Sequence, residues 1–78
     1  MVIFMQEYLN DLLEDLRKEG NELFATKRLE LSCEFYANAL NLARHMTENG
    51  TAPSGQVIST LLSNKAACLL KQVRHNLN

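Results

Sequence analysis

The sequence has few of the residues that define several large protein classes. Two cysteines, Cys33 and Cys68, are too few for a disulfide framework, and because both have apolar neighbours we expect them to be packing residues. No apolar run in the sequence, including that of residues 1–5, is long enough for a membrane span or for the apolar part of a secretory signal. We therefore expect a soluble, cytoplasmic protein without a membrane partner.

An excess of charge of one sign is also missing. The chain carries eight Lys and Arg residues against nine Asp and Glu residues, which gives a net charge of −1. Because there is no excess of positive charge, the composition does not indicate binding to nucleic acid. Apolar residues make up 46% of the chain, a composition typical of globular proteins and not of disordered ones. A length of 78 residues corresponds to one small domain.

The sequence contains no recognisable catalytic or metal-binding motif. His45 and His75 have no Cys or Asp at the spacing of metal ligands. There is no Gly-rich phosphate loop, and the carboxylates fall on polar helix faces without a pocket that would shift them toward acid–base catalysis. We expect no enzymatic activity, no metal and no cofactor.

Apolar residues recur at helical spacing in three segments. Between residues 5 and 24 they follow three- and four-residue steps that form one stripe, and Gly20 lies in that stripe. A glycine inside a helix costs about 1 kcal/mol relative to alanine, so we expect Gly20 to mark a close approach between helix backbones. Residues 29–46 carry two apolar stripes, which predicts a helix that is covered on two sides.

Residues 47–56 hold the only proline and two of the three glycines, which predicts a loop. The helical period resumes at Val57, continues to Val73 and is lost over residues 74–78. No segment sustains the alternation of apolar and polar residues that is typical of a strand. We therefore predict an all-α fold of about three helices.

Two stretches of the sequence resemble the tetratricopeptide repeat (TPR) family. In the first, large apolar, small and aromatic residues stand at the spacing that this family uses over roughly 34 residues: Leu16, Gly20-Asn21-Glu22-Leu23-Phe24, Ser32, Tyr36 and Ala39. The second stretch, residues 61–71, resembles the first helix of the next repeat, with Ala66 in the position of Gly20. The resemblance implies a TPR-like solenoid of antiparallel helix pairs, with close backbone contact at both small residues.

The resemblance also divides the chain into parts: an N-terminal helical extension over residues 1–12, a first repeat over 13–46, an inter-repeat loop over 47–56, and the first helix of a second, truncated repeat over 57–78. The sequence departs from the family at Arg44, where the repeat-closing proline is missing. It also has no glycine in the turn between the first two helices.

One and a half repeats would leave part of the apolar surface uncovered. Each unit of such an array buries its apolar face against its neighbours, and roughly three repeats are usually needed for stability. We expect Leu62, Leu69 and Leu70 to lack cover. The chain should then be a marginally stable monomer, should self-associate, or should be part of a longer protein.

Three polar residues match positions that bind ligands in one subset of the family. Arg17 and Asn21 are one turn apart on the same helix face, and Asn64 matches an Asn of the second repeat. In that subset the matching residues form a carboxylate clamp, which holds peptides ending in Glu-Glu-Val-Asp from cytosolic heat-shock chaperones. A guanidinium group offers paired donors to a carboxylate, and side-chain amides add donors without charge.

Two hypotheses for the function follow. The leading one is a non-catalytic, co-chaperone-type adaptor that binds a protein or peptide, with Arg17, Asn21 and Asn64 as the peptide-binding residues. The two further basic residues that the family takes from a third repeat are absent from this sequence, and ordinary surface roles for the three residues stay open. The alternative is a structural assembly piece, whose apolar helix edges pair with another subunit or with its own copy and which has no peptide ligand.

Overall fold

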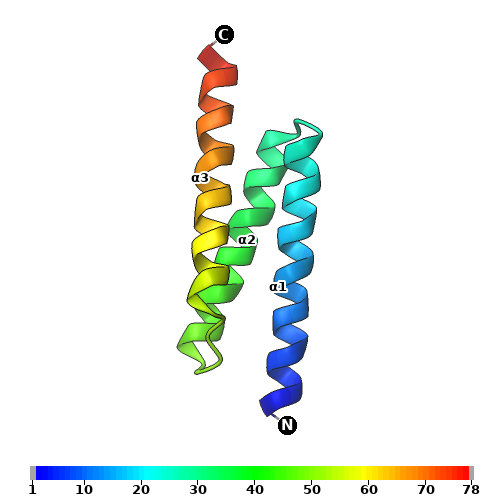
Figure 1. The fold of residues 1–78 in the computed structure, drawn as a ribbon, viewed down its shortest axis with the longest axis vertical. Coiled ribbons are helices and arrows are strands. Elements are labelled where there is room, and N and C mark those ends of the chain that lie inside the picture. The colour runs from blue at the N-terminus through cyan, green and yellow to red at the C-terminus, as the bar shows by residue number, and fades with distance from the viewer. Residues whose placement is uncertain (1, 78) are drawn as a thin grey trace.

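The protein consists of three α-helices joined by two short connections (Figure 1). A computed structural model describes the backbone of residues 2–77 and the side chains of residues 5–77; most of the apolar run at residues 1–5 therefore lies outside the described side chains. The helices are α1 (Val2–Ala25), α2 (Leu29–Glu48) and α3 (Gly55–Leu77). Consecutive helices run in opposite directions, and residues 2–77 contain no strand. The predicted all-α fold of about three helices is confirmed.

The central helix is α2, which packs against both α1 and α3, whereas α1 and α3 make far fewer contacts with each other. The prediction that the second helix is covered on two sides is therefore confirmed. The molecule is 51 Å long with a cross-section of 18 × 16 Å. Among the described helices, none is long and apolar enough to cross a membrane. The buried apolar core consists of Leu13, Leu29, Tyr36, Ala39, Ala43, Met46, Leu61 and Cys68.

Gly20 permits the close approach of α1 and α2. A Cβ atom at this position would lie 2.6 Å from Cε1 and 2.8 Å from Cδ1 of Tyr36, and the Tyr36 side chain is buried and has little room to withdraw. The Gly20 carbonyl also accepts a 2.8 Å hydrogen bond from the buried hydroxyl of Ser32. A contact between helices at Gly20 is confirmed, but the expected close approach of two backbones is not, because the atoms nearest to the glycine belong to the aromatic ring of Tyr36.

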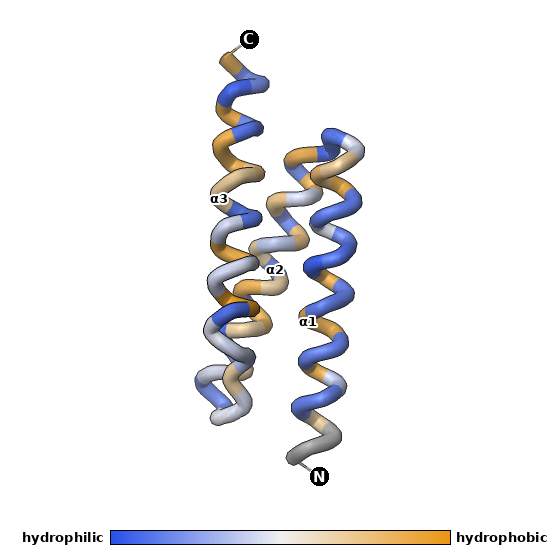
Figure 2. Tube along the Cα trace, viewed as in Figure 1, coloured by the Kyte–Doolittle hydropathy of each residue, from blue (hydrophilic) through white to orange (hydrophobic). Residues whose placement is uncertain are grey.

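The helix α3 has one buried face and one exposed apolar face. Leu61 and Cys68 are two turns apart and fully buried on the side that packs against α2. The opposite side carries what we call the outer apolar stripe, whose exposed members are Leu62, Leu69, Leu70, Val73 and Leu77. Figure 2 shows hydrophobic positions continuing along α3 past the end of the α1–α2 pair. The expected lack of cover for this part of the chain is confirmed.

The position of Ala66 contradicts one prediction from the sequence. Its side chain is exposed, so the expected close backbone contact at this residue is wrong. Gly20 faces α2, whereas Ala66 lies on the outer side of α3, where no other described helix packs against it. Ala67 is exposed as well, and Cys68 alone of this small-residue patch is buried.

The helices are longer than the apolar period predicted. The loop predicted over residues 47–56 is confined to 49–54, because the Ser54 hydroxyl accepts a 3.3 Å hydrogen bond from the backbone N–H of Val57 and so caps the start of α3. The tail predicted over residues 74–78 is helical up to Leu77. It contains neither Gly nor Pro, and Arg74 and His75 lie in the last turn, where positive charge favours a helix.

The end of α1 places a lysine in a left-handed backbone conformation. The backbone N–H of Arg28 donates to the carbonyl of Leu23 at 2.8 Å, and that of Lys27 donates to the carbonyl of Phe24 at 3.1 Å. These two bonds form a Schellman motif, which requires a left-handed residue just after the helix. That residue is Lys27, with φ of 63°, at a position that glycine usually occupies in this motif.

The end of α2 has the same Schellman motif, but with a glycine in the left-handed position. The backbone N–H of Thr51 donates to the carbonyl of Met46 at 2.8 Å, and that of Gly50 donates to the carbonyl of Thr47 at 3.2 Å. Here the left-handed residue is Gly50, with φ of 79°. The two helix ends therefore form a matched pair that differs in the residue at the critical position.

The substitution Lys27→Gly should stabilise the protein by about 0.5 to 1 kcal/mol, because it removes the steric cost of a side chain at positive φ and this gain exceeds the entropy lost with glycine. Urea unfolding measures the change. The mirror substitution Gly50→Ala should destabilise the protein by about 1 kcal/mol. A loss of stability in Lys27→Gly would contradict the prediction.

Candidate functional site

Two of the three predicted site residues meet between α1 and α3. The side chain of Asn64 on α3 donates a 3.4 Å hydrogen bond to Oδ1 of Asn21 on α1, across 43 residues of sequence. The same Oδ1 accepts a 2.6 Å hydrogen bond from the hydroxyl of Tyr36 on α2. All three helices therefore contribute one polar group to a single point.

This point lies in a small hollow. The hollow has a volume of about 190 Å³ and is lined by Asn21, Phe24, Tyr36, Asn64 and Ala67. Two aromatic side chains, two amides and one methyl group thus surround it. We call it the amide hollow. It presents hydrogen-bonding groups against an apolar background, as binding pockets for small polar groups do.

Arg17, the third predicted residue, is held by a partner on its own helix. Its Nε donates to Oε2 of Glu14 at 2.9 Å, and its Nη2 donates to Oε1 of the same carboxylate. The Arg17 side chain is 28% exposed and that of Glu14 is 45% exposed. Arg17 lies one turn from Asn21 but is not among the residues that line the amide hollow.

The pairing changes the proton affinity of both groups. The hydrogen bond from Arg17 is the largest cause that lowers the pKa of the Glu14 carboxyl, with smaller effects from the charges of Arg17 and Lys18. The same hydrogen bond raises the pKa of Arg17. An acidic ligand would therefore compete with Glu14 for the guanidinium group.

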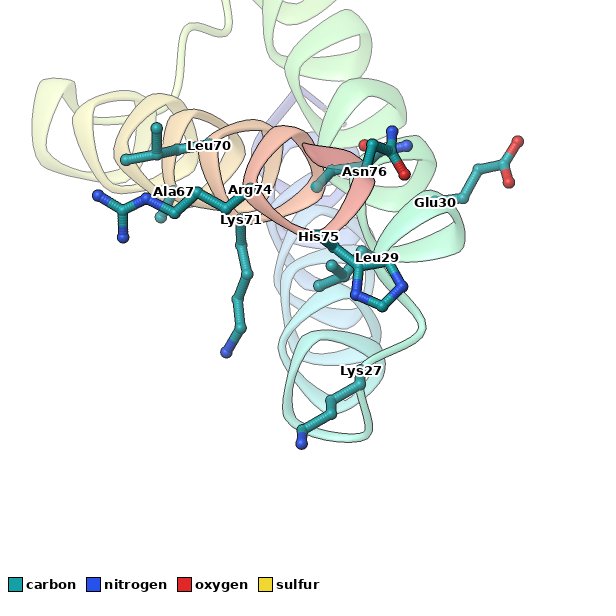
Figure 3. A pocket seen from close by; sticks show the side chains of 10 residues that line it. Lys27, Leu29, Glu30, Ala67, Leu70, Lys71, Arg74, His75 and Asn76 are labelled. Atoms are coloured by element: carbon teal, nitrogen blue, oxygen red, sulfur yellow. The ribbon is translucent and has the colours of Figure 1, made fainter. Parts of the chain in front are cut away.

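A larger basic groove adjoins the amide hollow and was not predicted from the sequence. It has a volume of about 710 Å³ and is lined by Lys27, Leu29, Glu30, Ala67, Leu70, Lys71, Gln72, Arg74, His75 and Asn76. Figure 3 shows Lys27 from the α1–α2 turn and Lys71 from α3 extending to the same side. The run of basic residues late in α3 is visible in the sequence, but its proximity to Lys27 depends on how α3 packs.

The two depressions are connected. Ala67 lines both of them, and the Lys71 ammonium group lies 5.1 Å from the centroid of the Phe24 ring, which borders the amide hollow. A cation over an aromatic face is attracted by the ring, so Lys71 is held at the junction. The surface from Asn21 to Lys71 therefore combines amide donors with positive charge.

The two histidines are not brought together. The Nδ1 atom of His45 lies 3.8 Å from Oε2 of Glu48 on an exposed part of α2. His75 lies in the basic groove on α3. Within the residues that the structure describes, no group of three or more His, Cys, Asp or Glu side chains could hold a metal ion.

Comparisons with family models, with curated proteins and with solved structures found no match to this chain.

The Glu14–Arg17 pair should be detectable in an acid titration. Because the folded-state pKa of Glu14 is lowered, the pair contributes stability above the unfolded pKa near 4.5, and this contribution is lost as the pH falls through the folded value. Both side chains are partly exposed, so the effect on stability should be below about 1 kcal/mol.

Carboxyl-resolved NMR measures the pKa of Glu14 directly. The substitution Arg17→Gln should return it to the ordinary range, whereas Lys18→Gln should leave most of the shift in place. An unchanged Glu14 pKa in Arg17→Gln would show that the pair does not form in solution.

Proposed function

We propose that this chain is a non-catalytic protein-interaction module, a TPR-like adaptor that binds an acidic peptide terminus along the amide hollow and the basic groove. The juxtaposition of Asn21 and Asn64 supports the proposal most strongly. Their positions match the clamp residues of the family, and they share one hollow although they come from different helices.

Charge complementarity also favours an acidic ligand. Four groove residues carry or can carry positive charge (Lys27, Lys71, Arg74 and His75), against the single carboxylate of Glu30. A C-terminus carries a carboxylate on its backbone, which interior peptide segments lack, and side-chain amides can donate hydrogen bonds to it. Because chaperones with such termini are cytosolic, we propose a cytoplasmic location.

Binding should be weak in the resting protein, because Glu14 occupies the guanidinium group of Arg17. A ligand carboxylate must displace this neighbour before it gains the paired hydrogen bonds that make arginine a strong carboxylate partner. Glu14 is therefore expected to act as an internal competitor.

A peptide ending in Glu-Glu-Val-Asp should bind at least about tenfold more tightly as the free acid than as the C-terminal amide, since a hydrogen bond to a charged group is worth about 1.5–3 kcal/mol. Isothermal titration calorimetry compares the two peptides. Asn64→Ala should weaken binding of the free acid, and Glu14→Gln should strengthen it by releasing Arg17.

The control for these variants is Asn41→Ala, which changes an exposed amide on α2 outside the amide hollow. It should bind like the unmodified protein. Equal affinity for the free acid and the amide would refute recognition of a peptide terminus.

The outer apolar stripe supports a second candidate function, a structural assembly piece. Its leucine and valine side chains at positions 62, 69, 70 and 73 are 46–54% exposed, and they lie on one face of α3. A contiguous apolar face of this kind is typical of a protein contact surface. A second copy of the chain could cover the stripe by pairing α3 with α3.

Sedimentation over a range of concentrations tests this assembly. If the stripe pairs two copies, the protein should dimerise. The double substitution Leu69→Gln with Val73→Gln should then weaken the dimer by at least about tenfold, because it removes roughly 1.5 kcal/mol or more of apolar burial and about 1.4 kcal/mol corresponds to a factor of ten. Tyr8→Gln changes an exposed side chain on α1 and should leave dimerisation unchanged. A strictly monomeric protein would exclude self-assembly through the stripe.

A further inference from the structure

The two cysteines lie in direct contact although 35 residues separate them in the sequence. The Sγ atoms of Cys33 on α2 and Cys68 on α3 are 2.7 Å apart, and both are free thiols. This separation is shorter than an ordinary contact between non-bonded atoms, and a covalent sulfur–sulfur bond of about 2.05 Å would require only a small further approach.

The surroundings hold the two thiols in place. The Cys68 sulfur is fully buried and lies 3.2 Å from the carbonyl oxygen of Leu29. The Cys33 sulfur is half-buried and lies 3.5 Å from Oε1 of Gln72. In the described part of the chain they have no third ligand for a metal site, so their shared chemistry is that of a dithiol.

We propose that Cys33 and Cys68 form a redox-responsive pair, which a small-molecule disulfide such as oxidised glutathione converts into an intramolecular disulfide that fastens α3 to α2. This inference does not depend on peptide binding or on self-assembly.

The reaction proceeds by two thiol–disulfide exchanges. The half-buried Cys33 loses its proton and attacks one sulfur of glutathione disulfide, which forms a mixed disulfide and releases one glutathione thiolate. The Cys68 sulfur, after losing its proton, then attacks the Cys33 sulfur and releases the second glutathione. The two protons end on the two glutathione thiols, and the two electrons that leave the protein reduce one glutathione disulfide.

Local chemistry makes this reaction slow at neutral pH. Burial, followed by the hydrogen bond and charge interaction with Cys68, raises the pKa of Cys33 to about 12, against a smaller opposing effect of Lys65 on α3. The thiolate is the attacking species, so few molecules are reactive at a given moment. Independently of this rate, a reducing compartment keeps thiols reduced, so the dithiol is the resting form there and the disulfide forms under sustained oxidation.

The bond would act on the helix that is least well held. Contacts with α2 supply most of the packing of α3, and α3 carries Asn64 of the amide hollow as well as the outer apolar stripe. A disulfide restricts the unfolded chain more than the folded one. By thermodynamic linkage, folding raises the equilibrium constant for disulfide formation by a certain factor. The disulfide raises the equilibrium constant for folding by the same factor.

Redox titration in glutathione buffers tests the proposal. The ratio of intramolecular disulfide to dithiol is measured by alkylation and mass spectrometry, once in native buffer and once in concentrated urea. The disulfide should be favoured about 100-fold more in the native chain. The melting temperature of the oxidised form should then exceed that of the reduced form by roughly 10 °C.

The control variants are Cys33→Ser and Cys68→Ala. Circular dichroism first establishes that each variant has the helical signal of the parent chain and therefore folds without a disulfide. Each should give only a glutathione adduct or an intermolecular dimer, and no rise in melting temperature with oxidant. The proposal is overturned if the disulfide forms equally well in native buffer and in urea. It is also overturned if oxidation of the native parent chain yields only glutathione adducts.

Discussion

The packing of the Tyr36 ring against Gly20 is the contact on which the rest of the structure depends. The missing side chain at Gly20 gives the ring room to lie against α1. The Gly20 carbonyl satisfies the buried Ser32 hydroxyl, and the Tyr36 hydroxyl donates to Asn21. A buried hydroxyl without a partner costs about 1–3 kcal/mol, so these hydrogen bonds fix the position of α1 along α2. They also place Asn21 where α3 can meet it.

The attachment of α3 to α2 decides what the protein presents to partners. Leu61 and Cys68 anchor one face of α3, which turns the outer apolar stripe toward solvent. The same anchoring brings Asn64 to Asn21 and Lys71 to Phe24. A polar, basic surface and an apolar surface therefore adjoin each other on one helix, where Leu70 belongs to both. The cysteine pair lies in the contact that holds this helix against α2.

The sequence predicted the elements better than their limits. Apolar periodicity located all three helices because each buries a stripe at helical spacing. It missed the start of α3 at Gly55 and the helical residues 74–77, since helix ends depend on caps and turns more than on apolar period. It also missed the left-handed Lys27, because a lysine gives no local signal for that conformation.

The candidate site was predictable in part. The family resemblance, and not the periodicity, brought Asn21 and Asn64 into one site. Arg17 was expected beside them. The sequence could not predict its pairing with Glu14, because several acidic residues of α1 were possible partners. The close backbone contact expected at Ala66 was wrong, because the sequence pattern does not say whether another helix is present to cover a small residue.

Three amphipathic helices, and a contact at Gly20 between the first two, can be inferred from the sequence, because both follow from spacing within one helix. The contact of Cys33 with Cys68, the groove that Lys27 shares with Lys71, and the pairing of Arg17 depend instead on how the helices pack. Spacing fixes the helix face on which a residue lies. The distance between residues on different helices depends on how far the helices slide and rotate against each other, and the packing of the whole core sets that.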